Sequence, residues 1–268
     1  MKISCIIPTY NRKEFLVEAV NSVLSQTRKP DEIIIVNNGD ERVFLSDKLS
    51  KHVKVYDIVR NAGASQTRNF GAGVATGDYL AFLDDDDLWG SDYLKNVTGV
   101  IRGKSNLVVS RLDCVVADGV INPFKNPSKT VTIDNILTYN PGITGSNIVI
   151  SKKVFLEVGG FDVTLPTSED KSLVLEVLRR GISAKTLPNN QVIMRDHGGE
   201  RLSDPVKLSI GISQFTKKYL HLMSKRQYLI NLVKIYKYKY CAGHVFAGFP
   251  YFFLRTVNKI VNGWIFGK

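Results

Sequence analysis

Short apolar runs alternate with amphipathic segments over the first hundred residues. Residues 3–7 (ISCII) predict a buried strand that ends at Pro8. A helix is predicted next, with Asn11 as its N-cap, Glu14 three positions later and apolar side chains at helical spacing. Further strands are predicted at residues 33–36, 53–58 and 79–83, and a helix at residues 65–75. This order is typical of a parallel sheet covered by helices, so the predicted class is α/β.

The pattern beyond residue 101 is less regular. Strands are predicted at residues 107–116 and 146–150, and helices behind a cap at Ser151 and at residues 170–180. Gly181 is expected to end the last helix in a left-handed conformation. No linker or internal repeat interrupts residues 1–205, so we predict one domain there, whose second half closes a crevice. Residues 206–268 are predicted to be a helical tail.

A polar cluster follows each of the four strands predicted in the first hundred residues. The clusters are Thr9-Tyr10-Asn11, Asn37-Asn38-Gly39-Asp40, Arg60-Asn61 and Asp84-Asp85-Asp86-Asp87. Because the carboxyl ends of parallel strands meet at one edge of an open α/β sheet, we expect these clusters to line a single crevice.

Four consecutive carboxylates directly after a buried strand need neutralisation. Two unit charges about 4 Å apart repel by about 4 kcal/mol at an effective dielectric constant of about 20. A solvated acidic turn is one interpretation of residues 84–87, and a bound divalent cation is another. Because the preceding strand directs this run into the predicted crevice, we favour Mg²⁺ or Mn²⁺ shared with a diphosphate.

Two further segments carry candidate chemistry. Glu169-Asp170 is a second acidic site, although an acidic pair at a helix N-terminus is also a favourable partner of the helix dipole. His197 and Arg201 lie in a Gly-rich segment that we expect to be mobile. A histidine and an arginine on such a loop suit closure over a phosphate.

Several common catalytic motifs are absent. Gly71, Gly73 and Gly77 precede a predicted strand and lack dinucleotide-binding spacing, and the P-loop-like Gly99 to Ser105 is one residue short. No GxSxG or HExxH motif occurs. Hydride transfer, P-loop NTP hydrolysis, serine hydrolysis and zinc proteolysis therefore lack their usual markers.

The charge of the chain is concentrated in its C-terminal segment. The 268 residues carry a net charge of +11, and residues 206–268 hold eleven Lys or Arg and no Asp or Glu. The remaining 25 basic and 25 acidic residues balance in residues 1–205, and 13 of the 26 aromatic residues lie in the tail. Basic and aromatic residues together suit an anionic membrane surface or a nucleic acid. A helical tail packed on its own domain or on a second subunit is the alternative.

Cysteine content and hydropathy indicate the compartment. Cys5, Cys114 and Cys241 are odd in number and far apart, which argues against a disulfide framework or a zinc site and fits a reducing cytoplasm. The apolar N-terminal run is too short for a signal peptide. The most apolar run, residues 240–254, is shorter than the roughly 20 residues of a membrane-spanning helix.

Five motifs, taken in order, resemble those of family-2 glycosyltransferases of the GT-A fold. They are Ile6-Ile7-Pro8-Thr9-Tyr10-Asn11-Arg12, Arg68-Asn69 with Gly77-Asp78-Tyr79, Leu83 to Asp87, Gly159-Gly160-Phe161-Asp162 and Ser168-Glu169-Asp170. The resemblance covers residues 1–205 and does not include the tail. It implies a Rossmann-like mixed sheet flanked by helices.

The resemblance also implies roles for individual residues. Asp84 and Asp86 occupy the DxD positions and would bind the metal. Asp86 is the foremost metal ligand, and Asp84 faces the nucleoside. Asp170 matches the catalytic base. The nucleotide-sugar site would comprise Pro8, Thr9, Asn11, Asn37, Arg68, Asp84, Asp85 and Asp86, together with His197 and Arg201. Asn37-Asn38-Gly39-Asp40 departs from the commoner Asp-Asp-Gly-Ser, which leaves the identity of the base open, although an Asn carbonyl can accept from a uracil N–H.

The expected activity is inverting transfer of a sugar from a nucleotide-diphospho-sugar, foremost a UDP-sugar, to an acceptor hydroxyl, with Mn²⁺ or Mg²⁺. The resemblance and the basic tail together suggest O-antigen or capsule assembly on a polyprenyl-diphosphate-linked saccharide. The enzyme would be cytoplasmic and peripheral on the cytoplasmic face of the inner membrane, through its tail, and an oligomer is compatible with the sequence. The alternative is a non-catalytic sugar-nucleotide or nucleic-acid binding protein; we expect no nucleic acid, because RNA binding does not explain two acidic sites at one crevice.

Overall fold

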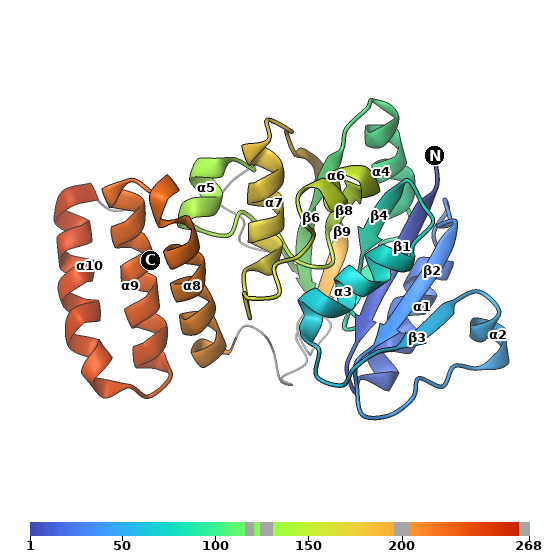
Figure 1. The fold of residues 1–268 in the computed structure, drawn as a ribbon, viewed down its shortest axis with the longest axis horizontal. Helices are drawn as coiled ribbons and strands as arrows, with labels where there is room; N and C mark the ends of the chain where they lie inside the picture. Colours follow the sequence, from blue (N-terminus) through green and yellow to red (C-terminus); the bar gives the residue numbers. More distant parts are fainter. Residues whose placement is uncertain (116–120, 124–130, 196–203, 263–268) are drawn as a thin grey trace.

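Four parallel strands from the N-terminal part of the chain form one half of a nine-stranded mixed sheet (Figure 1). They are β1 (Ile3–Thr9), β2 (Glu32–Asn37), β3 (Lys54–Asp57) and β4 (Tyr79–Phe82), in the order β3-β2-β1-β4. The computed structural model describes residues 1–115, 121–123, 131–195 and 204–262. The predicted parallel strands are confirmed.

The other half of the sheet is mixed. It comprises β5 (Asp87–Trp89), β6 (Leu107–Val115), β7 (Ile121–Pro123), β8 (Ile148–Ser151) and β9 (Lys185–Arg195). The spatial order continues β4-β8-β6-β9-β5, and β7 pairs with β6. β8 runs antiparallel to both β4 and β6, whereas β6 and β9 are parallel. Strands β5, β7 and β9 were not predicted from the sequence.

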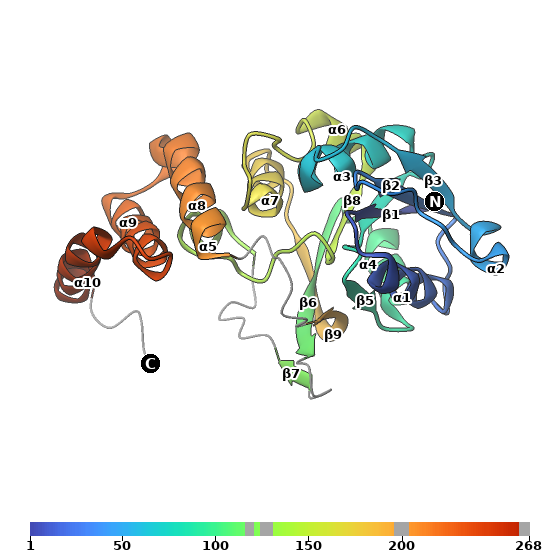
Figure 2. The same ribbon diagram turned by 90° about the horizontal axis from the view of Figure 1, so that it is seen from below.

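Helices cover both faces of the sheet (Figure 2). Along the chain they are α1 (Lys13–Leu24), α2 (Asp47–Ser50), α3 (Gly63–Val74), α4 (Tyr93–Arg102), α5 (Ile133–Thr138), α6 (Lys152–Glu157), α7 (Glu169–Arg179), α8 (Pro205–Tyr219), α9 (Lys225–Cys241) and α10 (Gly248–Asn262), with the 3₁₀ turns η1 (Leu220–Leu222) and η2 (Val245–Ala247). Helices α1 and α4 pack on one face, and α3, α6 and α7 pack on the other.

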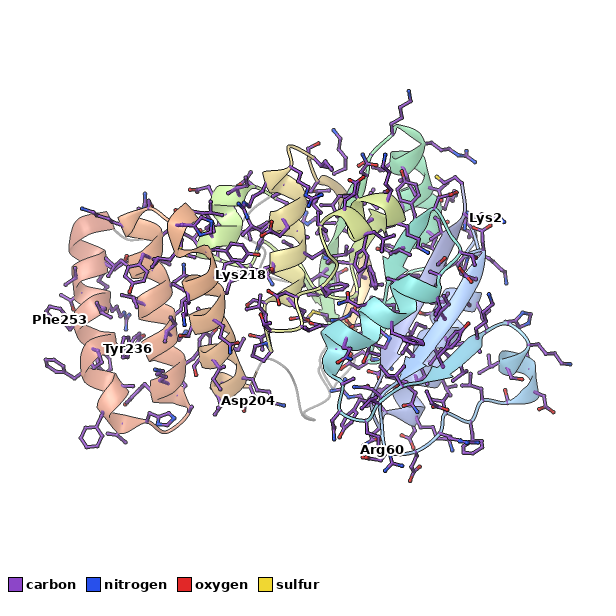
Figure 3. All side chains as sticks on the ribbon, in the orientation of Figure 1. Lys2, Arg60, Asp204, Lys218, Tyr236 and Phe253 are labelled. Carbon is purple, nitrogen blue, oxygen red and sulfur yellow. The ribbon has the colours of Figure 1, made fainter. Side chains whose placement is uncertain are left out.

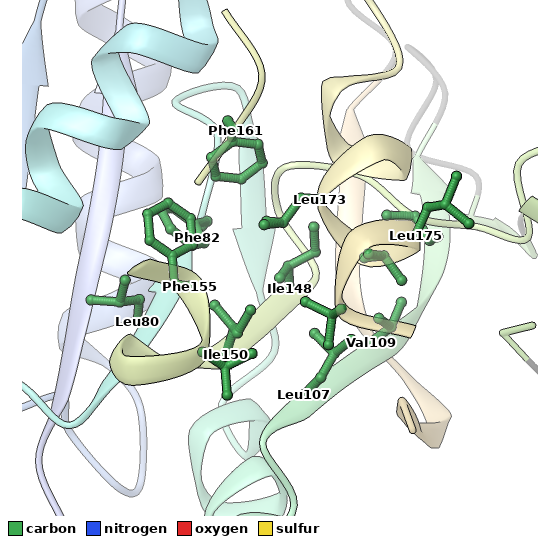
Figure 4. Packing of buried hydrophobic residues seen from close by; sticks show 14 of the residues in the cluster. Leu80, Phe82, Leu107, Val109, Ile148, Ile150, Phe155, Phe161, Leu173 and Leu175 are labelled. Atoms are coloured by element: carbon green, nitrogen blue, oxygen red, sulfur yellow. The ribbon is translucent and has the colours of Figure 1, made fainter. Parts of the chain in front are cut away.

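The alternating side chains of the strands feed two hydrophobic clusters. On β1, Ile6 joins the cluster under α3, α6 and α7, while Cys5 and Ile7 join the cluster under α1 and α4. Figure 4 shows Phe82, Phe155 and Phe161 packed together in the first cluster, where the ring centroids of Phe82 and Phe161 are 5.0 Å apart. These buried layers fix the carboxyl ends of the strands relative to α7.

The helices of the tail pack against the body of the protein in sequence order. Phe215 and Tyr219 of α8 are buried in the first cluster, and the Tyr219 hydroxyl lies 2.6 Å from Ser172 Oγ on α7. Gln227 and Asn231 of α9 donate to Asp134 and to the Leu137 carbonyl of α5. Helix α10 packs on α9 and is the outermost of the three (Figures 1 and 2). The helical tail is confirmed, and the domain boundary at residue 205 stays a prediction.

Of the two predicted helix N-caps, one lies at another residue and one lies where it was predicted. Asn11 has φ +52 and precedes Arg12, which is the N-cap of α1; the Asn11 side chain instead bonds to Asp40. Ser151 occupies the N-cap of α6 without a capping hydrogen bond from its side chain. Gly181, with φ +77, ends α7 in the predicted left-handed conformation. Within the described residues, no helix is long and apolar enough to cross a membrane.

Candidate active site

A cavity of about 960 Å³ lies at the carboxyl ends of the parallel strands, and we call it the strand-end cavity. Its lining includes residues of the four predicted polar clusters, namely Thr9, Tyr10, Asn11, Asn38, Asn61, Asp84, Asp85, Asp86 and Asp87. The N-terminus of α7 contributes Ser168, Glu169, Asp170 and Lys171, and α8 and α9 contribute the far wall. The predicted convergence of the clusters on one crevice is therefore observed.

The four aspartates alternate in exposure. The side chains of Asp84 and Asp86 are 26% and 18% exposed, whereas Asp85 and Asp87 are buried. Asp85 accepts from Thr9 Oγ1 at 2.7 Å, and burial followed by the charge of Asp86 raises its pKa to about 6. Asp87 accepts from the Ser146 hydroxyl, and burial raises its pKa well above the usual value. The two DxD carboxylates are thus the ones most open to the cavity.

Arg12 provides a cation beside this acidic run. Its Nη1 lies 2.5 Å from Asp86 Oδ2 and 3.2 Å from Asp85 Oδ1. Arg12 lines the cavity as well. No role for Arg12 was predicted from the sequence, although it is the last residue of the first motif and lies just beyond the end of β1.

Arg68 connects the two acidic sites. Its Nη2 lies 2.5 Å from Asp84 Oδ1 and its Nη1 lies 3.0 Å from Glu169 Oε1, and the side chain is only 2% exposed. Burial alone would lower the pKa of Arg68, but Asp84 and Glu169 outweigh it and raise the pKa above its usual value. Because both terminal nitrogens are engaged by protein carboxylates, Arg68 holds Asp84 and Glu169 in position at the cavity wall.

Gly145 leaves the space that the Arg68 guanidinium occupies. A Cβ at this position would overlap the guanidinium and lie 2.7 Å from Asp84 Oδ1. The loop before β8 therefore approaches the ion pair so closely that a side chain cannot be accommodated without moving Arg68 or Asp84.

Asp170 is the acidic residue best suited to accept a proton. It lies in the first turn of α7, where its Oδ1 accepts from the Lys171 backbone N–H at 2.6 Å. Burial and the neighbouring Glu169 raise its pKa to about 7. Glu169 is paired with Arg68, whereas Asp170 has no ion pair within the described residues. A carboxylate with a pKa near neutrality fits a general base.

The backbone is strained around the same cavity. Asn11, Asn61 and Ser168 have φ values of +52, +55 and +70, and all three line it. Non-glycine residues in the left-handed region are uncommon and concentrate at functional sites. Ser168 directly precedes α7, so this conformation sets the direction in which Glu169 and Asp170 enter the cavity.

Not every predicted site residue reaches the cavity surface. Pro8, Thr9, Asn11, Arg68, Asp84, Asp85, Asp86 and Asp170 line it. Asn37 is not among the lining residues; its amide donates to Asp57 and to the Glu41 carbonyl, and its oxygen accepts from the Gly39 N–H. The adjacent Asn38 lines the cavity instead. His197 and Arg201 lie outside the described residues.

The DxD carboxylates are chemically suited to a divalent cation. Mg²⁺ and Mn²⁺ favour oxygen ligands and are commonly held by one or two carboxylates together with substrate phosphates. Within the described ranges, no three His, Cys, Asp or Glu side chains form a cluster that could hold a metal. Asp84 and Asp86, which are partly exposed and line the cavity, are of the residue type that holds such a cation together with a diphosphate.

Comparison with known proteins establishes the class of this fold and site. Residues 4–159 match the family model for glycosyl transferase family 2, so the chain belongs to this family. An uncharacterized glycosyltransferase of Haemophilus influenzae is 31% identical over 182 residues, which cover 66% of this chain and 62% of that protein. A similar protein of Rickettsia conorii is 30% identical, and the matched region covers only 31% of its length. The chain thus spans less than two thirds of these relatives.

One relative is similar over most of both chains. It is the Escherichia coli UDP-Glc:alpha-D-GlcNAc-diphosphoundecaprenol beta-1,3-glucosyltransferase WfaP, 30% identical over 227 residues, or 80% of this chain and 85% of that protein. Among solved structures, S. aureus TarS 1-349 in complex with UDP-GlcNAc superposes with a TM-score of 0.62 at 18% identity, covering 89% of this chain and 81% of that one. This likeness shows the fold, which is the predicted GT-A fold.

Proposed function

We propose that this glycosyltransferase transfers a sugar from a UDP-sugar to an acceptor hydroxyl with inversion and with a divalent cation. The observation that carries the proposal is the Arg68 bridge, which brings the DxD motif and the Glu169-Asp170 motif to one cavity. The printed names of WfaP and of the TarS complex support a UDP-sugar as the donor.

The donor would occupy the part of the cavity nearest β1 and β4. Pro8, Thr9 and Asn11 lie there and would contact the base and ribose, while Asp84 and Asp86 would hold Mn²⁺ or Mg²⁺ with the diphosphate. When bound, the cation stabilises the negative charge that develops on the departing diphosphate. Asp85 would support this arrangement, because it accepts hydrogen bonds from the Thr9 hydroxyl and from the Arg12 guanidinium.

Asp170 would act on the acceptor. It takes the proton of the acceptor hydroxyl, the oxygen attacks the anomeric carbon from the face opposite the diphosphate, and the bond from that carbon to the diphosphate oxygen breaks. UDP leaves and the configuration inverts. Arg68 would keep Glu169 ionised beside the base, and the negative charge of Glu169 keeps the proton affinity of Asp170 high.

A lipid-linked saccharide is the acceptor class that we favour. WfaP is named for a diphosphoundecaprenol-linked acceptor, and a Haloferax volcanii relative, 30% identical over 64% of this chain, is a glucosyl-dolichyl phosphate glucuronosyltransferase. Together with the basic tail, these names support a role in assembling a surface polysaccharide such as O-antigen or capsule.

The end of the tail carries a surface suited to a membrane, which we call the aromatic surface. It comprises Val245, Phe246, Phe249, Phe252 and Phe253 on η2 and α10. Phe246 and Phe249 are 97% and 82% exposed, and Phe253 lies on the outermost helix in Figure 3. Because the tail has eleven basic and no acidic residues, we propose that this surface binds the anionic cytoplasmic face of the inner membrane.

A donor screen tests the proposed activity. Thermal shift with UDP-, dTDP- and GDP-sugars, each with and without Mn²⁺, should show stabilisation by a UDP-sugar that increases with the metal. Stabilisation by another nucleotide alone, or none by any donor, would contradict the proposed donor class.

A further inference from the structure

The strand-end cavity is electrostatically divided. Its acidic end consists of Asp84, Asp85, Asp86 and Asp87, which follow β4. Its basic end consists of Lys171 of α7 and the lining residues of α8 and α9, which are Lys207, Leu208, Ile212, Asn231, Lys234 and Tyr238. None of these is acidic. Asp170, the proposed base, directly precedes Lys171 and so lies where the two ends meet.

Lys171 is a buried cation that faces this cavity. Its side chain is 7% exposed and lines the cavity, and its Nζ lies 4.1 Å from the ring centroid of Phe215. Within the described residues, no hydrogen bond or ion pair is formed by this ammonium group, and Asp170 is the charged group that acts on it most strongly. Burial lowers the pKa of Lys171 to about 8, although Asp170 opposes the shift. Burying most of a charged side chain is costly, and an anion in the cavity would offset that cost.

Lys234 brings a second ammonium group to the same cavity. It extends from α9 and donates to the Thr138 carbonyl at the end of α5, which uses one of its three N–H groups. Burial, followed by repulsion from Lys171 and Lys237, lowers its pKa to about 7. Both lysines line one cavity and repel one another. An anionic ligand bound by both would relieve this repulsion.

We propose that Lys171 and Lys234 bind the phosphate groups of the acceptor, and that the acceptor is therefore a glycosyl phosphate or diphosphate attached to a lipid. This inference rests on the proposed function, because it places the acceptor hydroxyl at Asp170. Ile143, Leu208 and Ile212 line the same cavity and offer apolar contacts to the lipid.

The geometry of inversion separates this site from that of the donor diphosphate. An acceptor oxygen that attacks in line must approach from the side of the anomeric carbon opposite the leaving group. With the donor diphosphate at the acidic end, the acceptor then lies on the side of α7, α8 and α9. Lysine suits such a site because its compact charge binds phosphate oxygens in several orientations.

Calorimetric binding of geranyl diphosphate in the presence of saturating UDP and Mn²⁺ tests the inference. Geraniol is the matched probe without phosphate, and Lys239→Gln is the matched charge control, since Lys239 is exposed on α9 and does not line the cavity. We expect Lys171→Gln and Lys234→Gln each to weaken geranyl diphosphate binding by about tenfold or more. Lys239→Gln should bind within about twofold of wild type and geraniol more weakly than its diphosphate.

Three results would overturn the inference. The first is wild-type affinity in both Lys171→Gln and Lys234→Gln; the second is equal loss in Lys239→Gln, which would indicate a general charge effect. The third is competition between geranyl diphosphate and UDP, which would place the probe's phosphates in the donor site. UDP binding is measured first in the wild type and in every variant. A wild type that does not bind UDP contradicts the proposed function. Variants that bind UDP and show no effect of the lysine substitutions contradict only this inference.

Discussion

Asp84 and Glu169 bind the two terminal nitrogens of one guanidinium, that of Arg68. Asp84 follows β4 and Glu169 begins α7, so this contact joins the two halves of the domain at the cavity. Removing one partner of an ion pair this well buried strongly destabilises the folded protein, because a buried charge then remains without an opposite charge. The bridge is therefore the structural link between the proposed donor part of the site and the proposed base.

Gly145→Ala should break this link. The new Cβ would collide with the guanidinium, so we expect a loss of about 1–3 kcal/mol in the free energy of unfolding. Activity should fall in addition, because Asp84 and Glu169 lose their common partner. Gly73→Ala is the matched control: it lies in α3, where the new methyl group would have no neighbouring atom within 4 Å, and should be neutral or stabilising. Equal behaviour of the two variants in urea unfolding would argue against the bridge.

Asp170→Asn should lower kcat by about 10²- to 10⁴-fold while leaving the UDP dissociation constant nearly unchanged. Burial raises the pKa of Asp170 from 3.8 to about 7. The stability that protonated Asp170 contributes to the folded protein is therefore lost as the pH rises through about 7. The neutral amide avoids this loss, so the melting temperature of the variant at pH 8 should equal or exceed that of wild type.

The pH profile provides the control for this assignment. Since a base must be deprotonated, kcat of the wild type should rise with pH through about 7. Glu176→Gln, in the same helix and paired with Arg179, should keep this profile. A near-normal kcat for Asp170→Asn, or an unchanged rising limb, would remove Asp170 from the role of base.

Asp86→Ala should abolish the contribution of the metal to donor binding. The side chain is open to the cavity and would supply a carboxylate oxygen to the cation. Titration of UDP with and without Mn²⁺ should show a metal-dependent gain in affinity for wild type and little or none for the variant. Full activity in excess EDTA would contradict the proposed metal.

Replacing Phe246 and Phe249 by Ser should release the protein from anionic vesicles. Each ring is expected to contribute about 1.5–3 kcal/mol when it leaves water, so loss of the pair should weaken partitioning by about a hundredfold or more. Phe44→Ser is the control, since Phe44 is 68% exposed but belongs to the N-terminal part of the chain. Sedimentation with vesicles of phosphatidylglycerol and phosphatidylethanolamine measures the effect. Unchanged binding of the double variant would exclude the aromatic surface.

Point variants are preferable to truncation at residue 205. Phe215 and Tyr219 are buried in the core beneath α8, and Lys218, labelled in Figure 3, pairs with Asp162 at 2.5 Å. Removing the whole tail would expose this part of the core, so loss of vesicle binding could not be separated from unfolding.

The sequence predicted the elements whose residues follow a local pattern. The apolar runs before Pro8 and Asp84 and the helical stripe beginning at Phe15 identify β1, β4 and α1, because burial on one or both faces dictates each residue type. β9 was missed because Pro188, Asn189 and Asn190 interrupt its apolar positions. β5 has three residues, which is too few for a periodic signal.

The candidate site also contains residues that the sequence predicted and residues that it did not. Asp84 and Asp170 follow recognisable motifs, and the structure places both in the cavity. Lys171 and Lys234 carry no such signal, because their proximity arises from packing of α9 on α5 and of α8 on α7. Asn37 has the residue type for base recognition, but its hydrogen bonds to Asp57 and Gly39 are visible only in three dimensions.

In the proposed mechanism, base and leaving group lie on opposite sides of the anomeric carbon within one cavity. Proton NMR of slow UDP-sugar hydrolysis tests it directly, because the first anomer released reports the face of attack before mutarotation. With an α-linked donor we predict that β-sugar appears first in wild type and that Asp170→Asn slows its release. Initial release of the α-sugar would contradict the account.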